Sequence, residues 1–289
     1  MRSARGGAPP SRGATRLAAT LDAVSVDRVS GAHRLARTTS RALGRAIRIW
    51  NRDPPPKVRA AVRSASGHLD ATQPAMGVFH RWAVEWSDIA RNSSDRDLLT
   101  DLARWQRTWA DRLRREPGRL ARVARRELPP AARVLTLSRS DSVRRALLAP
   151  RRARRPRAVV VLESRPGGEG RTFARELLRA GLPARAVTDA EGRQRVRDAG
   201  LVLIGADAVY ADGSVVHKVG TRRVALAAKR AGVPVVVVAG RSKIVPGAIP
   251  TARLPRLFDR TPAMAVHEYW TDLGRIPAAR WSRFTARAR

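Results

Sequence analysis

The pattern of hydrophobic and polar positions changes once along the chain, at the proline pair 129–130. Over residues 14–128 apolar residues recur at helical spacing, and β-branched runs are absent. The spacing predicts a helix over 31–50, which the prolines at 54–56 end because proline lacks a backbone donor and restricts the residue before it. Further helices are predicted to begin near Lys57, near Pro74 and near Ser94 or Asp95.

After residue 130, short β-branched apolar runs alternate with helix-like segments. The runs predict strands at 133–137, 158–163, 184–188, 201–204 and 234–239, and the segments between them predict helices at 141–149, 169–180, 189–199 and 220–231. Strands that alternate with helices pair in parallel, and near-continuous apolar strands indicate a sheet covered on both faces. The predicted fold class is α/β: a helical N-terminal domain followed by a doubly wound, mainly parallel, Rossmann-like sheet domain.

This organisation divides the chain into four expected parts. Residues 1–13, rich in Gly, Pro, Ser and Arg, are expected to form a disordered basic tail. The helical domain is expected over 14–130, the ligand-binding α/β domain over 131–277 and a basic C-terminal tail over 278–289. No apolar run approaches a membrane span, and the basic start leads into no hydrophobic stretch typical of a secretory signal. We expect a cytoplasmic protein without a membrane partner.

Four tryptophans stand in two pairs at helical spacing. Trp82 and Trp86, and then Trp105 and Trp109, are each four residues apart and share a helix face. Such a stripe could stack nucleic-acid bases, but tryptophans at this spacing more often pack in a core. The sequence therefore favours a packing role in the helical domain.

Charge and composition narrow the classes of function. The 289 residues include 58 Lys+Arg and 24 Asp+Glu, a formal net charge of +34, and no cysteine, which excludes disulfides, thiolate metal sites and a cysteine nucleophile. The charge is compatible with a polyanionic partner, but residues 1–150 carry 30 basic and 13 acidic side chains and residues 151–289 carry 28 and 11. Arginines make up 54 of the basic residues, which also fits a compositional bias. A nucleic-acid partner stays open but is not favoured.

In a doubly wound sheet, ligands bind outside the carboxyl ends of the strands. The residues that follow the predicted strands there include hydroxyl, basic and acidic groups: Ser138-Arg139-Ser140-Asp141, 163–170, Gly205-Ala206-Asp207 and Gly240-Arg241-Ser242-Lys243. This composition suits an anionic ligand. The segment RPGGEGR at 165–171 resembles a phosphate-binding turn, although Gly-Gly before a helix is also an ordinary turn. No dinucleotide or ATPase fingerprint is present and the five histidines lack metal-ligand spacing, so neither a cofactor nor a metal is expected.

Four motifs of the second half occur in the order of a known family. They are ESRPGGEG at 163–170, GAD at 205–207, DGSVVHKVGT at 212–221 and FDRTP at 258–262. Together they resemble the family of translation initiation factor 2B alpha, beta and delta subunits, whose superfamily also contains methylthioribose-1-phosphate isomerase and ribose-1,5-bisphosphate isomerase. Fainter similarity at 30–43 and 73–82 extends the resemblance over about 28–277.

The resemblance implies a catalytic pair if the protein is an isomerase. In those enzymes a cysteine after the first strand and the aspartate of the GAD motif move a proton between C1 and C2 of an open-chain sugar phosphate. Asp207 matches the aspartate, but Ser138 stands at the cysteine position. A serine hydroxyl cannot replace a tunable thiol without help, and no histidine is placed by the sequence to activate it. The Ser138-Arg139-Ser140 turn instead resembles that of the initiation-factor subunits, which also lack the thiol.

The resemblance also implies a site for a phosphorylated ligand. The expected binding residues are Arg139, Ser140, Glu163, Arg165, Gly170, Asp207, His217 and Lys218. Arg165 could hold a phosphate in a two-pronged contact, whereas His217 replaces an asparagine of the family pattern. Each residue also has a structural alternative: Glu163 and Arg165 as an internal ion pair, Asp207 as a loop cap, and Lys218 as a surface lysine. Gln73, where the family often has arginine, removes one expected phosphate contact.

Three functions are compatible with these observations. The preferred hypothesis is an initiation factor 2B-like protein that binds a phosphorylated sugar or nucleotide in a regulatory role, as a homodimer or higher oligomer. One alternative is a divergent aldose–ketose isomerase acting on ribose 1,5-bisphosphate or methylthioribose 1-phosphate. The other is an RNA- or ribosome-associated protein that binds through its arginine surface.

Overall fold

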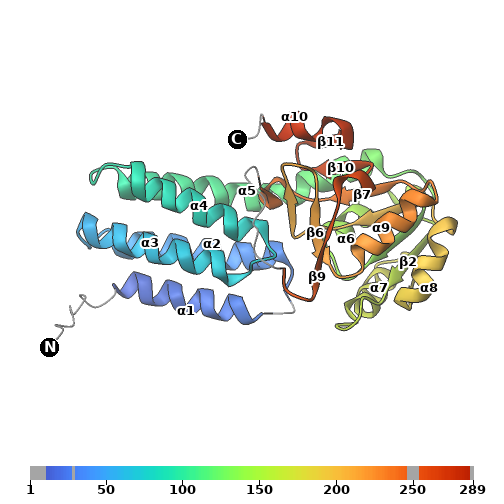
Figure 1. The fold of residues 1–289 in the computed structure, drawn as a ribbon, viewed down its shortest axis with the longest axis horizontal. Helices are drawn as coiled ribbons and strands as arrows, with labels where there is room; N and C mark the ends of the chain where they lie inside the picture. Colours follow the sequence, from blue (N-terminus) through green and yellow to red (C-terminus); the bar gives the residue numbers. More distant parts are fainter. Residues whose placement is uncertain (1–10, 28–29, 246–253, 287–289) are drawn as a thin grey trace. The chain divides into compact units, whose positions relative to one another are not determined.

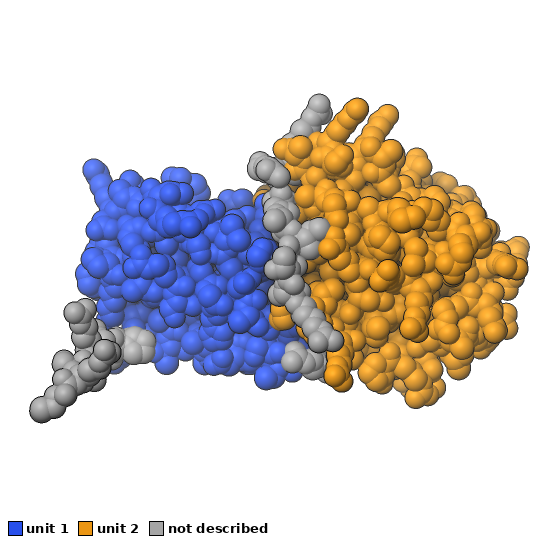
Figure 2. All heavy atoms as spheres, viewed as in Figure 1, with its two compact units in different colours: residues 1–30, 34–73, 79–111 blue, residues 31–33, 74–78, 112–289 orange. Residues whose placement is uncertain are grey.

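The computed structural model describes residues 11–27, 30–245 and 254–286. The chain forms two compact units, coloured separately in Figure 2. The first consists of residues 1–30, 34–73 and 79–111, and the second of 31–33, 74–78 and 112–289. Residues 1–10 of the expected basic tail, and 287–289 at the other end, lie outside the described residues.

The first unit is helical, as predicted (Figure 1). Its helices are α1 (Arg12–Val26), α2 (Ala32–Trp50), α3 (Pro55–Thr72), α4 (Gly77–Asn92) and the first part of α5 (Leu98–Glu127). Helix α1 begins earlier than expected because Ser11 caps it: the Ser11 hydroxyl oxygen accepts from the Ala14 N–H at 3.2 Å and from Trp50 Nε1 at 2.9 Å. Residues 11–13 therefore belong to this unit and not to a tail.

The paired tryptophans form the core of the helical unit. Trp82, Trp86 and Trp109 are at most 2% exposed, and the rings of Trp82 and Trp109 meet edge to face with centroids 5.3 Å apart. The carboxylate of Glu85 accepts hydrogen bonds from the indole nitrogens of Trp105 and Trp109, both at 2.6 Å. The predicted packing role is confirmed, and the buried rings of Trp82, Trp86 and Trp109 are not available to stack on bases.

The second unit is built on a seven-stranded sheet in the order β11-β10-β7-β4-β1-β2-β3. The strands are β1 (Arg133–Leu137), β2 (Ala158–Leu162), β3 (Ala184–Val187), β4 (Leu201–Ile204), β7 (Val235–Val238), β10 (Glu268–Thr271) and β11 (Gly274–Pro277). All neighbours are parallel except β10 and β11. The five predicted strands are confirmed, and so is the doubly wound, mainly parallel fold class.

Helices cover both faces of this sheet (Figure 1). The elements are α6 (Asp141–Leu148), α7 (Glu169–Arg179), α8 (Asp189–Gln194), α9 (Thr221–Arg230) and α10 (Trp281–Ala286). One apolar layer joins the strands to α6 and α7, and the other joins them to α9 and α10. Leu120, Val123 and Ala124 of α5 pack in the first layer, so the end of α5, expected in the helical domain, forms part of the α/β unit.

A second, smaller sheet was not predicted. Its order is β8-β5-β6-β9, formed by β5 (Ala208–Tyr210), β6 (Val215–Lys218), β8 (Ile244–Val245) and β9 (Phe258–Thr261). Strands β5 and β6 form a hairpin around Asp212-Gly213, where Gly213 has φ +82°, and an Asp-Gly pair is the sequence signal that could have revealed it. Strand β6 of this sheet carries His217 and Lys218, two of the residues expected to bind a ligand.

The segment expected as a C-terminal tail is instead part of the folded unit. Trp281 is 2% exposed, its Nε1 donates to the carbonyl of Tyr210 at 2.8 Å, and its ring lies 3.9 Å from that of Tyr269. Helix α10 therefore extends the α/β unit to at least Ala286. The tryptophan in the printed sequence was the available signal, because a large aromatic residue gains most from burial.

Candidate functional site

The candidate site lies at the carboxyl ends of β1 and β4. These strands are neighbours in the sheet, and the chain leaves β1 toward β2 and β3 on one side but leaves β4 toward β7 and β10 on the other. Such a reversal of strand order opens a place for ligands between the two turns. The turn after β1 carries 138–140, and the turn after β4 carries 205–207.

The turn after β1 holds its two serines in different ways. Ser138 has φ +58°, in the left-handed region, and its N–H donates to the Ser164 hydroxyl at 2.7 Å. Ser140 is the N-cap of α6, and its hydroxyl oxygen accepts from the Val143 N–H at 3.4 Å. Among the described residues no carboxylate, imidazole or amine makes a hydrogen bond to the Ser138 hydroxyl. Arg139 points to the carboxylate of Glu176, with 2.9 Å between Nε and Oε1.

Glu163 and Arg165 form the internal pair that was one of the two expectations for them. The Arg165 Nε lies 2.9 Å from one oxygen of Glu163, and the Arg171 guanidinium lies 2.6 Å from the other. The hydrogen bonds from Arg165 and then Arg171 lower the pKa of Glu163, and Glu163 raises the pKa of Arg165. The Arg165 side chain is still 69% exposed, so its guanidinium could meet an anion only in competition with this carboxylate.

In the glycine turn at 165–171, backbone N–H groups that a phosphate could bind are used within the protein. The N–H of Gly168 donates to the carbonyl of Ser164 at 3.0 Å, and the N–H of Gly170 donates to the carbonyl of Glu163 at 3.1 Å. Gly170 is required for packing instead, because a Cβ there would lie 1.9 Å from the carbonyl oxygen of Leu162 in β2. The first turn of α7 is already supplied with a negative charge by Glu169.

The carboxyl group of Asp207 is under the influence of two lysines. The pKa of its carboxyl group is raised by burial and is lowered to a smaller extent by Lys243 and Lys218. In the part of the chain that the structure describes, no hydrogen bond or ion pair reaches this carboxylate, whereas its backbone N–H and C=O are bonded to Val216 and Gly77. A largely desolvated carboxylate without a protein partner is the kind of group that meets a ligand.

The two lysines differ in their partners. The Nζ of Lys218 lies 2.6 Å from Oε1 of Glu169, so its charge is neutralised within the structure. The Nζ of Lys243, a residue 7% exposed, donates to the carbonyl of Ala206 at 2.6 Å. A carbonyl is neutral, so this hydrogen bond leaves the charge of Lys243 to act on the carboxylates around it, Asp207 and Glu116.

His217 is the histidine of the site. It is 6% exposed on β6, and burial, followed by the charges of Lys243 and Lys218, lowers its pKa to about 3. Its Nδ1 lies 3.2 Å from the hydroxyl of Thr221. The imidazole is therefore neutral at physiological pH and cannot contribute a charge to phosphate binding.

Glu116, which the sequence analysis did not select, supports the segment that carries Lys243. Its carboxylate accepts from the N–H of Ser242 at 2.8 Å and from the hydroxyl of Ser242 at 2.7 Å. Burial, and then the charge of Asp272, raises the pKa of Glu116 to about 6. No sequence signal marked Glu116, because it lies on a helix whose contact with the turn after β7 exists only in the folded unit.

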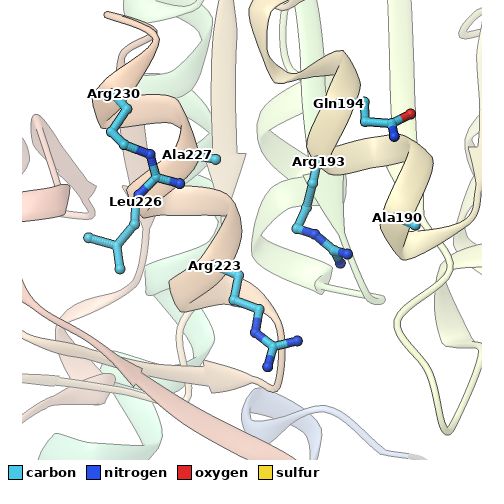
Figure 3. A pocket seen from close by; sticks show the side chains of 7 residues that line it. All are labelled: Ala190, Arg193, Gln194, Arg223, Leu226, Ala227 and Arg230. Carbon is cyan, nitrogen blue, oxygen red and sulfur yellow. The ribbon is translucent and has the colours of Figure 1, made fainter.

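A separate groove lies between α8 and α9 and is lined by three arginines: Arg193, Arg223 and Arg230 (Figure 3). The apolar side chains of Leu226 and Ala227 complete its wall. None of the residues predicted for the ligand site lines this groove. Three arginines of the α/β unit therefore surround this hollow.

Within 11–27, 30–245 and 254–286, no three His, Asp or Glu side chains gather as a metal site would require. In the same ranges, no helix has both the length and the apolar character needed to cross a bilayer. The expectation of no metal stays a prediction.

The fold and this site define a class of protein: a helical unit joined to a Rossmann-like unit with a polar site at the strand ends. The profile of the Initiation factor 2 subunit family matches residues 28–254. The chain belongs to this family.

Proteins with similar sequences carry two different names. A ribose 1,5-bisphosphate isomerase of Haloferax volcanii is 33% identical over 144 residues, which cover 41% of this chain and 44% of the relative. A Pyrococcus abyssi protein named as a putative translation initiation factor eIF-2B subunit 2-like is 28% identical over 231 residues, 80% of each chain. The chain thus spans less than half the length of the isomerase relative that it matches.

Solved structures of initiation-factor proteins share the fold. The Pyrococcus horikoshii translation initiation factor eIF-2B has a TM-score of 0.75 at 24% identity and covers 91% of this chain and 97% of its own. The tetrameric eIF2B beta2-delta2 complex of C. thermophilum contains a chain with a TM-score of 0.77 at 19% identity, with 94% of each chain covered.

Proposed function

We propose that this protein binds a phosphorylated sugar or nucleotide at the carboxyl ends of β1 and β4, in a regulatory role and without the isomerase thiol. The observation that carries the proposal is the carboxylate of Asp207, which has no protein partner in the described residues and lies near the cations Lys218 and Lys243. A carboxylate suits ligand hydroxyls, and neighbouring lysines suit a phosphate.

Calorimetric titration with ribose 5-phosphate, AMP and inorganic phosphate tests this proposal. We expect Lys218→Met to weaken binding of all three by about tenfold or more, because about 1.4 kcal/mol of charge-assisted contact is lost. The matched control is Lys229→Met at the end of α9, which should leave the affinities unchanged. The proposal fails if nothing binds at millimolar concentration, or if both variants behave like the unaltered protein.

A divergent isomerase is the second candidate, and the pKa of Asp207 is the observation that favours it. Burial raises the pKa of Asp207, so its carboxyl group holds a proton more readily than an ordinary aspartate, as an acid–base residue requires. Against it stands Ser138, which has no base within hydrogen-bond distance among the described residues. An aldose-to-ketose assay on ribose 1,5-bisphosphate, run with Asp207→Asn, separates the two: turnover that this substitution abolishes would support the enzyme.

We also propose that the chains associate as a homodimer or a higher oligomer through the α/β unit. The support is the tetrameric assembly of a structural relative. Light scattering coupled to size-exclusion chromatography would measure the assembly, and a single species at the 31.7 kDa of one chain would contradict it.

A further inference from the structure

A basic groove lies between α1 and α2, in the helical unit and not in the unit that carries the ligand site. Its arginines are exposed and come from both helices and from the turn that follows α2. The basic residues that line it are Arg12, Arg16, Arg45, Arg48, Arg52 and Lys57. The carboxylate of Asp53 also lines the groove, and the Nζ of Lys57 lies 3.5 Å from it. Five arginines therefore surround one hollow whose carboxylate is already paired with a lysine.

The two helices of the groove differ from the rest of the helical unit in how their arginines are paired. On α4, for example, the Nε of Arg81 lies 2.7 Å from the carboxylate of Glu85. Helix α2 contains no acidic residue, and the acidic residue of α1, Asp22, lies 2.9 Å from His68. Over the described ranges, none of the five groove arginines forms an ion pair. The groove thus keeps its positive charge, which attracts an anionic partner.

The arginines stand at intervals that suit a row of phosphates. Arg12 and Arg16 are about one turn apart on α1, as are Arg45 and Arg48 on α2, and Arg52 follows the end of α2. One turn of helix rises about 5.4 Å, close to the distance between neighbouring phosphates of one nucleic-acid strand. Guanidinium groups can hold phosphate oxygens in two-pronged contacts. The groove therefore suits a single strand whose phosphates meet arginines from both helices.

The floor of the groove favours a nucleic acid over an acidic peptide. Leu17, Ala42 and Ala46 are at most 3% exposed, which leaves Ile49 and the small Ala19 as the apolar side chains that a partner could contact. A peptide binds a helical groove through several apolar anchors, whereas a phosphate backbone requires only charge and N–H donors. The lining residues that the structure describes include no aromatic side chain on which a base could stack. Binding without sequence preference follows.

Thr20 of α1 favours RNA over DNA. Its hydroxyl donates to the carbonyl of Arg16 at 3.1 Å, so the oxygen of Thr20 can still accept a hydrogen bond from a partner in the groove. A ribose 2′-hydroxyl can donate to that oxygen, and DNA has no such group. We propose that the groove between α1 and α2 binds single-stranded RNA through its sugar–phosphate backbone. This binding function is separate from the proposed ligand site and uses none of its residues.

Fluorescence anisotropy of the full chain with a labelled uridine oligoribonucleotide of about 12 nucleotides tests the proposal. Arg45→Gln and Arg48→Gln together should weaken binding about tenfold or more. The slope of log affinity against log salt concentration should become shallower by about 1.4, the change for two lost phosphate contacts. The matched control combines Arg96→Gln with Arg107→Gln, two exposed arginines of the same unit outside the groove, and should change neither quantity. Equal losses in the two double variants would assign the binding to overall charge and overturn the proposal.

Asp53→Asn provides a readout in the opposite direction. It removes the acidic charge from the described lining of the groove and should strengthen RNA binding about two- to fivefold. A deoxyuridine oligonucleotide of the same length should bind more weakly than the RNA, and a polyglutamate peptide of equal charge should not displace the RNA. Equal affinity for DNA, displacement by polyglutamate, or weaker binding by Asp53→Asn would each contradict the assignment. Failure to bind RNA would overturn this inference and leave the proposed ligand site untouched.

Discussion

At the scale of single residues, the site is governed by which charges are already neutralised. Arg139, Arg165 and Lys218 each lie within 3 Å of a carboxylate oxygen, whereas Lys243 donates to a neutral carbonyl. An incoming anion must therefore compete with internal carboxylates for most of the cations that the sequence suggested. Glu169 is one such competitor, because it forms an ion pair with Lys218, whose charge also acts on Asp207.

Glu169→Gln is expected to strengthen binding of inorganic phosphate. The substitution leaves Lys218 without its counter-charge, and a partly buried ion pair of this kind is worth about 1 kcal/mol, or about fivefold in affinity. Calorimetry would measure the change. The control is Glu191→Gln on α8, which removes the ion-pair partner of Arg195 and should leave phosphate affinity unchanged. Weaker phosphate binding in Glu169→Gln would show that this carboxylate supports the ligand and does not compete with it.

At the scale of elements, close packing determines the glycine at position 170 in the turn from β2 into α7. Gly170 lies against the carbonyl of Leu162, and its N–H is used within the turn. The sequence RPGGEGR suggested a phosphate cradle because glycines at a helix N-terminus are shared by both kinds of turn. Only the hydrogen-bond partners distinguish them.

Gly170→Ala is expected to destabilise the α/β unit by about 3 kcal/mol, because the added methyl group cannot fit beside β2 without moving the backbone. Gly67→Ala is the matched substitution: a Cβ at Gly67 on α3 meets no atom within 4 Å, and alanine there should stabilise by about 0.5 to 1 kcal/mol. Urea unfolding would measure both. Equal changes in the free energy of unfolding would show that close packing at Gly170 does not exclude a side chain.

At the scale of the whole molecule, one buried carboxyl group links stability to pH. Glu116 has its pKa raised from 4.5 to about 6, so between these values the folded protein keeps a proton that the unfolded chain has lost. Stability from this group is therefore present below pH 4.5 and is lost as the pH rises through about 6. Its titratable neighbours are His33, with Nδ1 3.9 Å from Glu116, Asp272 and Lys243.

Glu116→Gln is expected to abolish this loss of stability at rising pH. An amide oxygen can still accept from the Ser242 N–H, but it carries no charge to desolvate. Relative to the unaltered protein, the free energy of unfolding of Glu116→Gln should rise by about 2 kcal/mol between pH 4.5 and neutral pH. Urea unfolding at the two pH values measures the difference. A difference that does not depend on pH would contradict the raised pKa.

The sequence by itself determined the fold class, the five central strands and the edge of the sheet where the polar residues gather. Local periodicity is enough for these features, because buried parallel strands are apolar throughout and their carboxyl ends meet at one edge. The ordered motifs also identified the family.

Only the tertiary structure decided what each polar residue does. Burial lowers the pKa of His217, and the carboxylate of Asp207 has no partner among the described residues. The basic side chains expected to bind a phosphate instead form ion pairs with Glu163, Glu169 and Glu176. These effects depend on groups far apart in the chain, such as Glu116 and Ser242, and on backbone carbonyls that no residue type reveals. The second sheet and helix α10 were missed for the same reason, since short strands and a single aromatic residue become stable only through contacts with the rest of the unit.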